Sequence, residues 1–594
     1  MKKFLTDIVV CGFTVLSFVC LFVFLQTHHI WGSVHIEQIL IHITEGVDFA
    51  PDQLKYGYIV SIILGIVSAV ACSVFLRNKT LVIVSAFICF FITWQIGGFS
   101  YFLNKKIYSK LYETEYLQPN NLHFEFLSGK RNLIVAYLES MEENYATDLQ
   151  TNLIPNMHAM SSQSLSFPGF HQIAFQDYTI AGLVESMCAV VYRGTSLKGY
   201  DAYRNFLTNL VCYPQILQQN GYQTVFMKSA DINFSRTGLF LKTHGFQEAL
   251  GAHELDKQFQ FPLKQNRGAF GGYHDKALYE MIKEKITELS HRNKPFFFSF
   301  LTLDTHTPDY FVSPDCPTTS SKQADAVSCA DSMLAKFISW LKEQPFWPNT
   351  TVVVLGDHPQ TGINRLYPKL HKRKIVNFIL NPAPAFSKAP HTSWTTLDVA
   401  PTILNAIGVS FDKQAFGLGR SLFASEPTLY EKLGHKLETE VFKTSEVYQS
   451  FEEIKNKSLP QYTLYTPLNR EISALNDIQK FATFSNEFFS AVFLEEMSFT
   501  LPPVQTDLTF RVKFKVMLSA AKEKFIRVYA NNTLVQTWRI TSSDRQPLLK
   551  EVLIPSHIIK QNKLLIRFET DDENPLSEAI GIGVFSFSIQ DDKH

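Results

Sequence analysis

The stretch Asn132–Leu138 reads NLIVAYL and continues directly into Glu139 and Ser140. It is short, almost wholly apolar and rich in β-forming residues, which is typical of a strand buried on both faces of a sheet. Similar apolar runs occur further along the chain, at Tyr222–Met227, Phe296–Leu303 and Thr351–Leu355, with a weaker one at Ile375–Leu380. We therefore expect a set of buried strands in the central part of the chain.

Segments long enough for helices separate or follow these runs, at Leu207–Gln219, His274–His291, Ala324–Lys342 and Trp394–Ile407. Strands that alternate with helices predict an α/β domain with a mostly parallel sheet. In such sheets ligands bind at the carboxyl ends of the strands. Glu139, His306 and the pair Asp357–His358 lie within a few residues of such ends, so we expect them to meet at one edge of the sheet.

These residue types indicate metal-assisted chemistry. The carboxylates of Glu139 and Asp357 and the imidazole of His358 would give one divalent metal mixed oxygen and nitrogen ligands. Thr179 opens a helix-like stretch, where a cation and a helix N-terminus would both make its hydroxyl a better nucleophile. His306 would bind a phosphoryl oxygen or protonate the leaving alkoxide. Each residue alone has an ordinary alternative as a cap or a solvated side chain, and only the set favours a site.

Weaker candidates surround this set. A phosphoryl group also calls for a cation, and Arg236 in the stretch Phe234-Ser235-Arg236-Thr237 is our candidate, although a plain surface charge is the alternative. Four further residues are candidates for lining the pocket or binding substrate, namely His244, His274, Asp275 and His391.

The first hundred residues predict a membrane anchor. Three apolar stretches, Phe4–Gln26, Tyr56–Leu76 and Thr80–Leu103, each have about the 20 residues that a spanning helix needs. The first would alternatively be a signal peptide. Positive charges at the N-terminus and between the second and third stretches place both on the cytoplasmic side, so everything after Leu103 is expected outside the membrane.

Three lysines just after the third stretch, Lys105, Lys106 and Lys110, are on the wrong side for this orientation. We expect them on a juxtamembrane helix that lies on anionic headgroups. Four cysteines follow in the exported part, and an even number there suggests disulfides in an oxidising compartment. Of the three possible pairings we prefer Cys188–Cys212 and Cys316–Cys329, because near neighbours close short loops; four free thiols are the alternative.

The C-terminal part has a different pattern. Phe423–Leu468 is more polar and helix-like, and from about Glu471 short segments alternate between apolar and polar residues, which predicts a small β-sandwich. The domains we expect are an anchor at 1–104, a juxtamembrane helix or linker at 105–130, a catalytic domain at 131–422, a connector at 423–470 and the sandwich at 471–594. The 55 basic residues equal the 55 acidic ones, which argues against a nucleic-acid partner.

The order of the motifs resembles a known family. The motifs are NLIVAYLESMEENY at Asn132–Tyr145, DYTIAGLVESM at Asp177–Met187, THGF at Thr243–Phe246, LTLDTHTPDYF at Leu301–Phe311, AVSC at Ala326–Cys329 and GDH at Gly356–His358. Together they resemble the sulfatase-fold phosphoglycerol transferases of the alkaline phosphatase superfamily, and most of all the phosphoglycerol transferase I group, which decorates periplasmic glucans. Lipoteichoic acid synthases are more distant relatives.

The resemblance implies that Glu139, Thr179, Asp357 and His358 form a site for one divalent ion (Mn, Mg or Zn) with Thr179 as the nucleophile, and that His306 contacts the substrate. It also implies a phospholipid donor of the phosphatidylglycerol type, a periplasmic glycan acceptor, and a multi-pass protein of the bacterial inner membrane with its catalytic domain in the periplasm. A covalent phospho-threonine intermediate would link the two half-reactions.

One departure from the family pattern and one difference from true sulfatases bear on substrate choice. A Trp-Gly pair common in the family is replaced by Gly271-Gly272, which leaves the acceptor and the donor headgroup open. Thr179 is followed by Ile-Ala-Gly rather than by a Cys-x-Pro-x-Arg-like pattern, so hydrolysis of sulfate esters is not expected. The alternatives that remain are phosphoethanolamine transfer to lipid A or another glycan, and a non-catalytic, membrane-tethered glycan-binding protein.

Overall fold

The computed structural model describes most of the chain, namely residues 2–31, 52–76, 78–96, 107–127, 129–194, 206–259, 267–307, 309–361, 364, 366–367 and 372–453, and strand segments between 463 and 591. The chain divides into two compact units. The first comprises Met1–Gly194 and Asn209–Phe451, and the second comprises Thr195–Thr208 and Glu452–His594.

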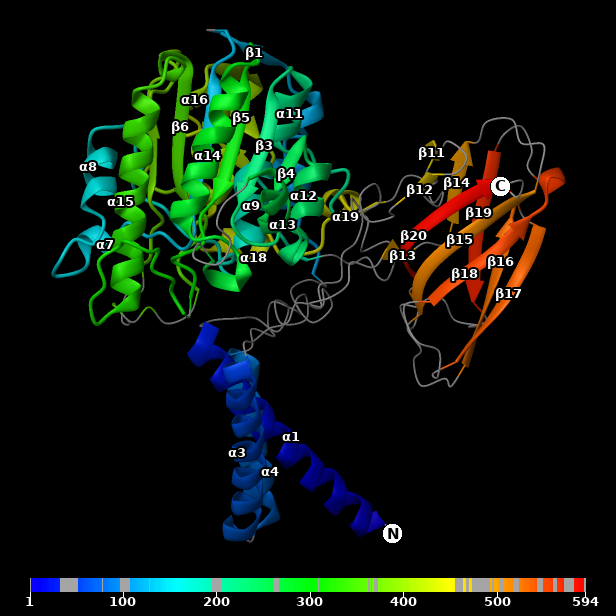
Figure 1. Ribbon diagram of the computed structural model, residues 1–594. Helices are drawn as coiled ribbons and strands as arrows, with labels where there is room; N and C mark the ends of the chain where they lie inside the picture. Colours follow the sequence, from blue (N-terminus) through cyan, green and yellow to red (C-terminus); the bar gives the residue numbers. More distant parts are fainter. Residues whose placement is uncertain are drawn as a thin grey trace. The chain divides into compact units, whose positions relative to one another are not determined.

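A six-stranded sheet in the order β4-β3-β5-β2-β6-β7 forms the centre of the first unit (Figure 1). Its strands are β2 (Asn132–Leu138), β3 (Gln223–Lys228), β4 (Glu248–Leu250), β5 (Phe296–Leu301), β6 (Thr350–Gly356) and β7 (Asn377–Leu380). Neighbouring strands are parallel from β4 to β6, and β7 is antiparallel to β6. The prediction of an α/β domain with a mostly parallel sheet is therefore confirmed.

Helices cover both faces of this sheet (Figure 1). Alternate residues of β2, Ile134, Ala136 and Leu138, belong to the same apolar core as residues of α14 (Asp275–Ser290) and α15 (Lys322–Lys342). On the other face Tyr137 shares a hydrogen bond with Ser186 of α9 (Thr179–Cys188), 2.9 Å between the two oxygens. Because both faces of β2 are buried, its sequence is apolar throughout instead of alternating.

Two of the expected helices are shorter than the sequence suggested. The segment Leu207–Gln219 becomes helical only at Tyr213 (α11, Tyr213–Gln219), where Pro214 occupies the first turn, a position that tolerates a missing N–H group. The segment Trp394–Ile407 forms a 3₁₀ turn at Thr396–Asp398 and then α16 (Val399–Ala406).

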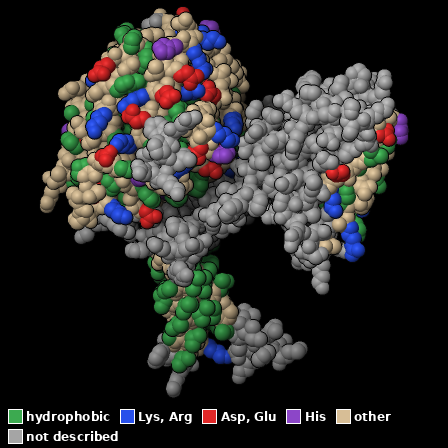
Figure 2. Space-filling model, viewed as in Figure 1, with side chains coloured by type: hydrophobic (Ala, Val, Ile, Leu, Met, Phe, Trp, Pro, Cys, Tyr) green, Lys and Arg blue, Asp and Glu red, His purple; other side chains and the backbone are tan. Residues whose placement is uncertain are grey.

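The N-terminal part consists of the helices α1 (Lys2–Trp31), α3 (Asp52–Leu76) and α4 (Lys79–Ile96). Two windows, Val10–Thr27 and Gly57–Val74, are long and apolar enough to cross a membrane, whereas the apolar part of α4, Lys79–Trp94, is shorter. Their exposed side chains are largely apolar (Figure 2). The remainder of the third expected span, together with Lys105 and Lys106, lies outside the described residues.

The segment expected as a juxtamembrane helix or linker contains short elements from residue 107 onward. These are α6 (Leu111–Glu115), a 3₁₀ turn at Pro119–Asn121, and β1 (Phe124–Phe126), which pairs with β8 (Val409–Phe411). Leu111 and Tyr112 are buried, and the Tyr112 ring contacts the rings of Tyr448 and Phe451. This segment therefore packs against residues 409–451 at the end of the first unit.

The second unit contains two mostly antiparallel sheets, in the orders β11-β14-β19-β16-β17 and β12-β20-β15-β18, with β13 beside β20. The strands are β11 (Thr463–Tyr465), β12 (Arg470–Ile472), β13 (Val492–Phe493), β14 (Glu496–Thr500), β15 (Leu508–Val516), β16 (Glu523–Ala530), β17 (Thr533–Thr541), β18 (Leu548–Ile554), β19 (Lys563–Thr570) and β20 (Ile582–Asp591). The β-sandwich, which requires the two sheets to lie face to face, stays a prediction.

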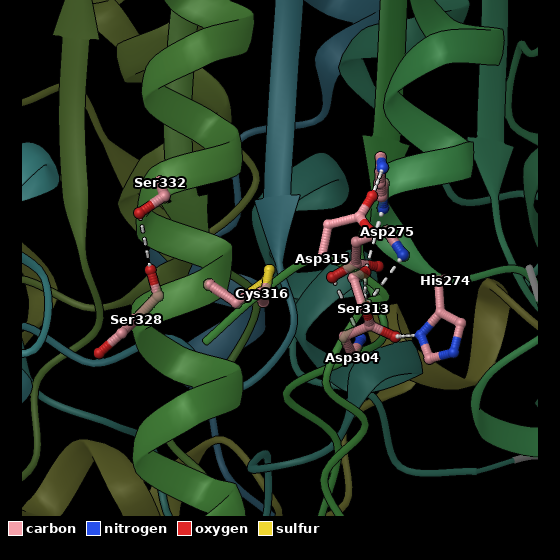
Figure 3. The surroundings of a disulfide bond; sticks show 10 residues. His274, Asp275, Asp304, Ser313, Asp315, Cys316, Ser328 and Ser332 are labelled. Carbon is pink, nitrogen blue, oxygen red and sulfur yellow. Dashed lines mark hydrogen bonds and ion pairs between the residues drawn. A yellow bond between two sulfur atoms is a disulfide. The ribbon is translucent and has the colours of Figure 1, made fainter. Parts of the chain in front are cut away.

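Both preferred disulfides are present, Cys188–Cys212 and Cys316–Cys329. The first joins the end of α9 to the residue before α11, and the second joins the loop after β5 to α15 (Figure 3). The free cysteines of the described chain, Cys11, Cys20, Cys72 and Cys89, all lie in the N-terminal apolar helices.

Candidate metal and nucleophile site

Adjacent strand ends place two carboxylates side by side. Glu139 directly follows β2, and Asp357 directly follows β6; in the parallel register of these strands Leu138 pairs with Gly356. The backbone of Ser140 then adopts a positive φ of 51°, an uncommon conformation for a residue with a side chain, so the chain turns sharply after Glu139. Both carboxylates are therefore held at the carboxyl edge of the sheet, where a ligand site is expected.

His358 completes a buried cluster with these two carboxylates. Ligand atoms of Glu139, Asp357 and His358 all lie within 4.8 Å of one another. Nε2 of His358 is 3.7 Å from Oε1 of Glu139 and 3.3 Å from Oδ2 of Asp357. Its Nδ1 lies 2.7 Å from the Pro359 carbonyl, to which it donates as N–H, so the lone pair of Nε2 is available towards the carboxylates.

The hydrogen bonds of Asp357 test whether a cation fits. Oδ1 accepts from the backbone N–H groups of Ser140 and His358, each at 2.9 Å, whereas Oδ2 is buried and has no hydrogen-bond partner among the described residues. Burial, together with the nearby Glu139, raises the pKa of Asp357 to about 7. Burial alone would lower the pKa of His358, but the Asp357 and Glu139 carboxylates outweigh it and raise that pKa. A divalent cation would satisfy the open oxygen and offset the crowded negative charge, so these residues fit one.

Thr179 lies against this cluster at the start of α9. Its Oγ1 donates to Oε2 of Glu139 over 3.3 Å, and Thr179 is the first residue of the ten-residue helix, so the positive end of the helix acts on its hydroxyl. A Cβ atom on Gly182 would lie 2.2 Å from the Asp357 carbonyl oxygen. Only glycine there lets the helix approach closely enough to bring Thr179 to Glu139.

His306 lies in the loop after β5 and acts on the same cluster. Its Nδ1 donates to the Thr307 carbonyl oxygen, and its ring meets the Phe270 ring edge-on at 4.9 Å. Burial would raise the pKa of Glu139, but the charges of His306 and His358 and the hydrogen bonds from Ser140 and Thr179 lower it instead. The structure therefore brings Glu139, Thr179, Asp357 and His358 into contact, and it places His306 near enough to affect the charge of Glu139.

The weaker candidates lie in four different places. Arg236 is in the turn after β3, with a positive φ of 58°, and its contact with a phosphoryl group stays a prediction. His274 and Asp275 lie at the start of α14, where His274 Nδ1 is 3.0 Å from Asp304 Oδ1 in the loop after β5. They therefore lie at the same edge of the sheet as Glu139.

The two remaining histidines have structural hydrogen bonds. Nδ1 of His244 lies 2.8 Å from the Phe240 carbonyl, and the next residue, Gly245, accepts from Thr224 near the start of β3, at the opposite end of that strand from the site. His391 is bonded through Nδ1 to Glu431 at 3.0 Å and through Nε2 to the Ala424 carbonyl at 2.8 Å. The structure therefore does not bring His244 or His391 to the metal and nucleophile site.

The sequence interpretation missed Lys228, the last residue of β3. Its side chain is buried, and its ammonium lies 5.7 Å from the centre of the Phe234 ring. It is also close enough to Glu139 for that carboxylate to affect its pKa. Burial lowers the pKa of Lys228 to about 8, although Asp231 and Glu139 partly oppose the change. The apolar run Tyr222–Met227 stops one residue before Lys228, and a lysine at the carboxyl end of a buried strand is itself an indication of a site.

Comparisons with known proteins agree with this geometry. Residues 131–409 match the family model described as Sulfatase. Phosphoglycerol transferase I of Salmonella arizonae and that of Escherichia fergusonii are each 32% identical over 308 residues, which cover 50% of this chain and 39% of each relative. The match thus spans well under two thirds of the length of these relatives.

Solved structures also match at low identity. The lipoteichoic acid synthase LtaP from Listeria monocytogenes is 17% identical, with 55% of this chain and 80% of that chain covered and a TM-score of 0.39. The phosphoglycerol transferase GacH from Streptococcus pyogenes, in complex with sn-glycerol-1-phosphate, is 17% identical, with 47% and 75% covered and a TM-score of 0.34.

The matched range contains the whole candidate set, including Glu139 directly after β2 and His358 after β6. Residues 131–409 match the Sulfatase family model and form a sulfatase-like α/β domain. The predicted resemblance of this chain to the phosphoglycerol transferases of that fold is confirmed.

Proposed function

We propose that this chain is a membrane-anchored, metal-dependent transferase that moves a phosphoglycerol group from a lipid of the phosphatidylglycerol type to a periplasmic glycan. The observation that carries the proposal is the hydrogen bond from Thr179 Oγ1 to Glu139 inside a buried cluster with Asp357 and His358. The relatives named phosphoglycerol transferase I support the class of group transferred.

Four side chains would hold the metal, namely those of Glu139, Thr179, Asp357 and His358. The set combines carboxylate, hydroxyl and imidazole ligands, which suits Mn²⁺, Mg²⁺ or Zn²⁺. When bound, the ion would act as a Lewis acid that favours the ionised threonine oxygen and offsets charge on the phosphoryl group.

In the first half-reaction the Thr179 oxygen attacks the phosphorus of the lipid headgroup. The bond between phosphorus and the diacylglycerol oxygen breaks, and the leaving oxygen takes a proton from His306. The threonine proton leaves along its hydrogen bond to Glu139 and passes to solvent, and His306 regains a proton from solvent before the next turnover. The buried ammonium of Lys228 and the guanidinium of Arg236 stabilise the phosphoryl oxygens. The product on the enzyme is a phosphoglyceryl-threonine.

In the second half-reaction a glycan hydroxyl attacks the same phosphorus and Thr179 is released. The donor is confined to a bilayer, so anchoring raises its effective concentration at the site. The apolar windows Val10–Thr27 and Gly57–Val74 are suited to that anchoring role.

The test measures the transfer of a labelled headgroup from the lipid donor to Thr179 and then to the glycan. The full-length protein is incubated with phosphatidylglycerol or phosphatidylethanolamine, each labelled in its headgroup, and Thr179 is examined by mass spectrometry after acid quenching. We expect a glycerol-phosphate adduct in the wild type and none in Thr179→Ala, which should still bind metal and melt normally. Thr114→Ala removes an exposed hydroxyl from α6 and should behave as the wild type does.

The possible outcomes separate the competing functions. An ethanolamine-phosphate adduct would keep Thr179 as the nucleophile and replace the donor. Glycan labelling by Thr179→Ala would remove the threonine from the mechanism. Absence of both metal and adduct from the wild-type protein would favour the non-catalytic, glycan-binding alternative.

A further inference from the structure

A second cluster of titratable side chains lies at the same edge of the sheet, and the mechanism above leaves it without a role (Figure 3). Nδ1 of His274 lies 3.0 Å from Oδ1 of Asp304, which follows β5. Oδ2 of Asp304 accepts from the backbone N–H of Asp275 at 3.1 Å and from the Ser313 hydroxyl at 2.5 Å. These three hydrogen bonds therefore hold the Asp304 carboxylate in one orientation.

A reciprocal contact makes this arrangement rigid. The carboxyl group of Asp275 accepts from the N–H groups of Leu303 at 2.7 Å and Asp304 at 3.1 Å, so the start of α14 and the end of β5 hold each other. Burial and the adjacent Asp304 raise the pKa of Asp275 well above its ordinary value. The disulfide Cys316–Cys329 also ties the loop that carries Asp304 and Ser313 to α15 (Figure 3).

The Asp304 contact determines which nitrogen of His274 is available. A carboxylate accepts only from an N–H group, so Nδ1 carries the hydrogen and Nε2 keeps its lone pair. Among the described residues no hydrogen bond to Nε2 is observed, and the side chain of His274 is 11% exposed. A Cβ atom on Gly268 would lie 3.0 Å from His274 Nδ1 and 3.2 Å from Asp304 Oδ1, so the glycine leaves room for the pair.

Three observations place His274 and Asp304 at the same sheet edge as the reacting centre. Asp304 follows β5, whose neighbour in the sheet is β2, and β2 leads into Glu139. Phe270, four residues before His274, packs against the ring of His306. The negative charge of Glu139 also contributes to the raised pKa of Asp275, the residue after His274. His274 thus lies at the same carboxyl edge of the sheet as Glu139, near the end of β5.

We propose that His274, oriented by Asp304, is the general base for the glycan hydroxyl, an assignment that rests on the proposed function and gives it a second proton-transfer residue. The acceptor oxygen forms its bond to phosphorus as the bond from phosphorus to Thr179 Oγ1 breaks. The acceptor proton moves to Nε2 of His274 and then returns through solvent to the threonine oxygen. His306 serves the leaving group of the first half-reaction and His274 serves the nucleophile of the second, so the two proton transfers have separate residues.

A purely structural role for His274 makes a different prediction. His274 is the N-cap residue of α14, but its side chain makes no capping hydrogen bond. Asparagine at this position has an amide N–H that reproduces the Nδ1 contact with Asp304 and has no basic nitrogen. The variant His274→Asn therefore keeps the structural contact and removes only the base.

The experiment uses the full-length protein with headgroup-labelled phosphatidylglycerol and a soluble glucan. The Thr179 adduct and the labelled glucan are quantified at successive times after acid quenching. We expect His274→Asn to form the adduct at the wild-type rate, to accumulate it, and to label the glucan about 10²- to 10³-fold more slowly, the usual effect of losing a general base. Added imidazole should restore part of the labelling in His274→Ala, which repair of a structural contact would not do.

A surface pair provides the matched control. His435 is exposed and its Nδ1 lies 2.8 Å from Glu438, so His435→Asn tests the same chemical change in another histidine–carboxylate pair and should leave both steps unaltered. Glucan labelling by His274→Asn at close to the wild-type rate would overturn the assignment. Equal loss of adduct and product would also overturn it, because the effect would then lie before the second step. A wild-type protein without any Thr179 adduct would overturn the proposed function itself.

Discussion

Asp357 shows why the individual residues favour a metal. One of its oxygens is held by two backbone N–H groups, and the other is directed towards His358 without a hydrogen bond. A buried carboxylate oxygen without a partner is costly, and a second carboxylate beside it adds repulsion. Hydrogen bonds to one oxygen and an open position at the other are the arrangement expected of a ligand rather than of a structural ion pair.

Lys228 gives a prediction about pH. Burial lowers its pKa to about 8, so the free enzyme loses this positive charge, and with it the proposed phosphate contact, as the pH rises through that value. We expect kcat/KM for the lipid donor to fall on the alkaline side of pH 8. Lys228→Arg keeps its charge at all accessible pH values and should move that decline upward by at least about one pH unit.

The comparison variant is Lys283→Arg, because Lys283 is paired with Glu280 on the outer part of α14. Its pH profile should match that of the wild-type protein. An alkaline decline that stays in place in Lys228→Arg would show that another group controls it, and Lys228 would then have to be removed from the phosphate site.

At the scale of elements, α9 is the part on which the geometry depends most. It presents Thr179 at its first turn and passes the Asp357 carbonyl at Gly182, where a Cβ atom would be only 2.2 Å from that oxygen. The Cys188–Cys212 disulfide holds its other end. The position of the nucleophile is therefore set by one close approach and one covalent bond.

Gly182→Ala should push α9 away from the metal ligands. We expect a loss of about 1–3 kcal/mol in the free energy of unfolding from overpacking, and a fall of about 10²-fold in the rate of Thr179 adduct formation from a displaced hydroxyl. Thermal unfolding and rapid-quench labelling measure the two effects. Gly12→Ala, in a helix where a Cβ atom meets nothing within 4 Å, is the control and should change neither. Normal adduct formation in Gly182→Ala would contradict the close-approach argument.

The elements also show what the sequence can and cannot predict. Long apolar runs such as Asn132–Leu138 identified β2, β3, β5 and β6, because strands buried on both faces have little freedom in composition. The run at 375–380 identified a strand, but composition carries no direction, and β7 is antiparallel to its neighbour. The three-residue strands β1, β4 and β8 are too short to produce a periodic signal.

The site was predictable to the extent that strand ends mark it. Glu139, His306, Asp357 and His358 lie within a few residues of the ends of apolar runs, and Thr179 begins a helix. A parallel sheet brings such strand ends to one edge, so their convergence could be expected. His391 and His274 look alike in the sequence, yet the His391 ring has both nitrogens bonded within the protein, whereas Nε2 of His274 has no hydrogen bond among the described residues. Only tertiary contacts distinguish two such histidines. The proximity of Lys228 to Glu139 likewise depends on tertiary structure and cannot be read from the sequence.

At the scale of the whole molecule, every residue of the candidate site belongs to the first unit, between Glu139 and His358. The second unit has its own sheets, and the strands expected from alternation in 506–589 correspond to β15–β20. Each unit therefore has its own hydrogen-bonded framework. The chain passes between the units after Gly194, after Thr208 and after Phe451, and none of these residues belongs to the candidate site.

Cutting the chain after Phe451 tests whether residues 463–594 contribute to adduct formation. A protease site is inserted within residues 455–462, the full-length protein is purified in folded form, and half of the sample is cleaved before labelled phosphatidylglycerol is added. Since the metal ligands, Thr179 and the N-terminal apolar helices all lie in the first unit, we expect cleaved and uncut protein to form the Thr179 adduct at rates within about threefold of each other. The same protein with a scrambled insert controls for the insertion. Loss of adduct formation on cleavage, with thermal unfolding unchanged, would mean that the second unit contributes to donor binding and that the site is not contained in residues 131–409.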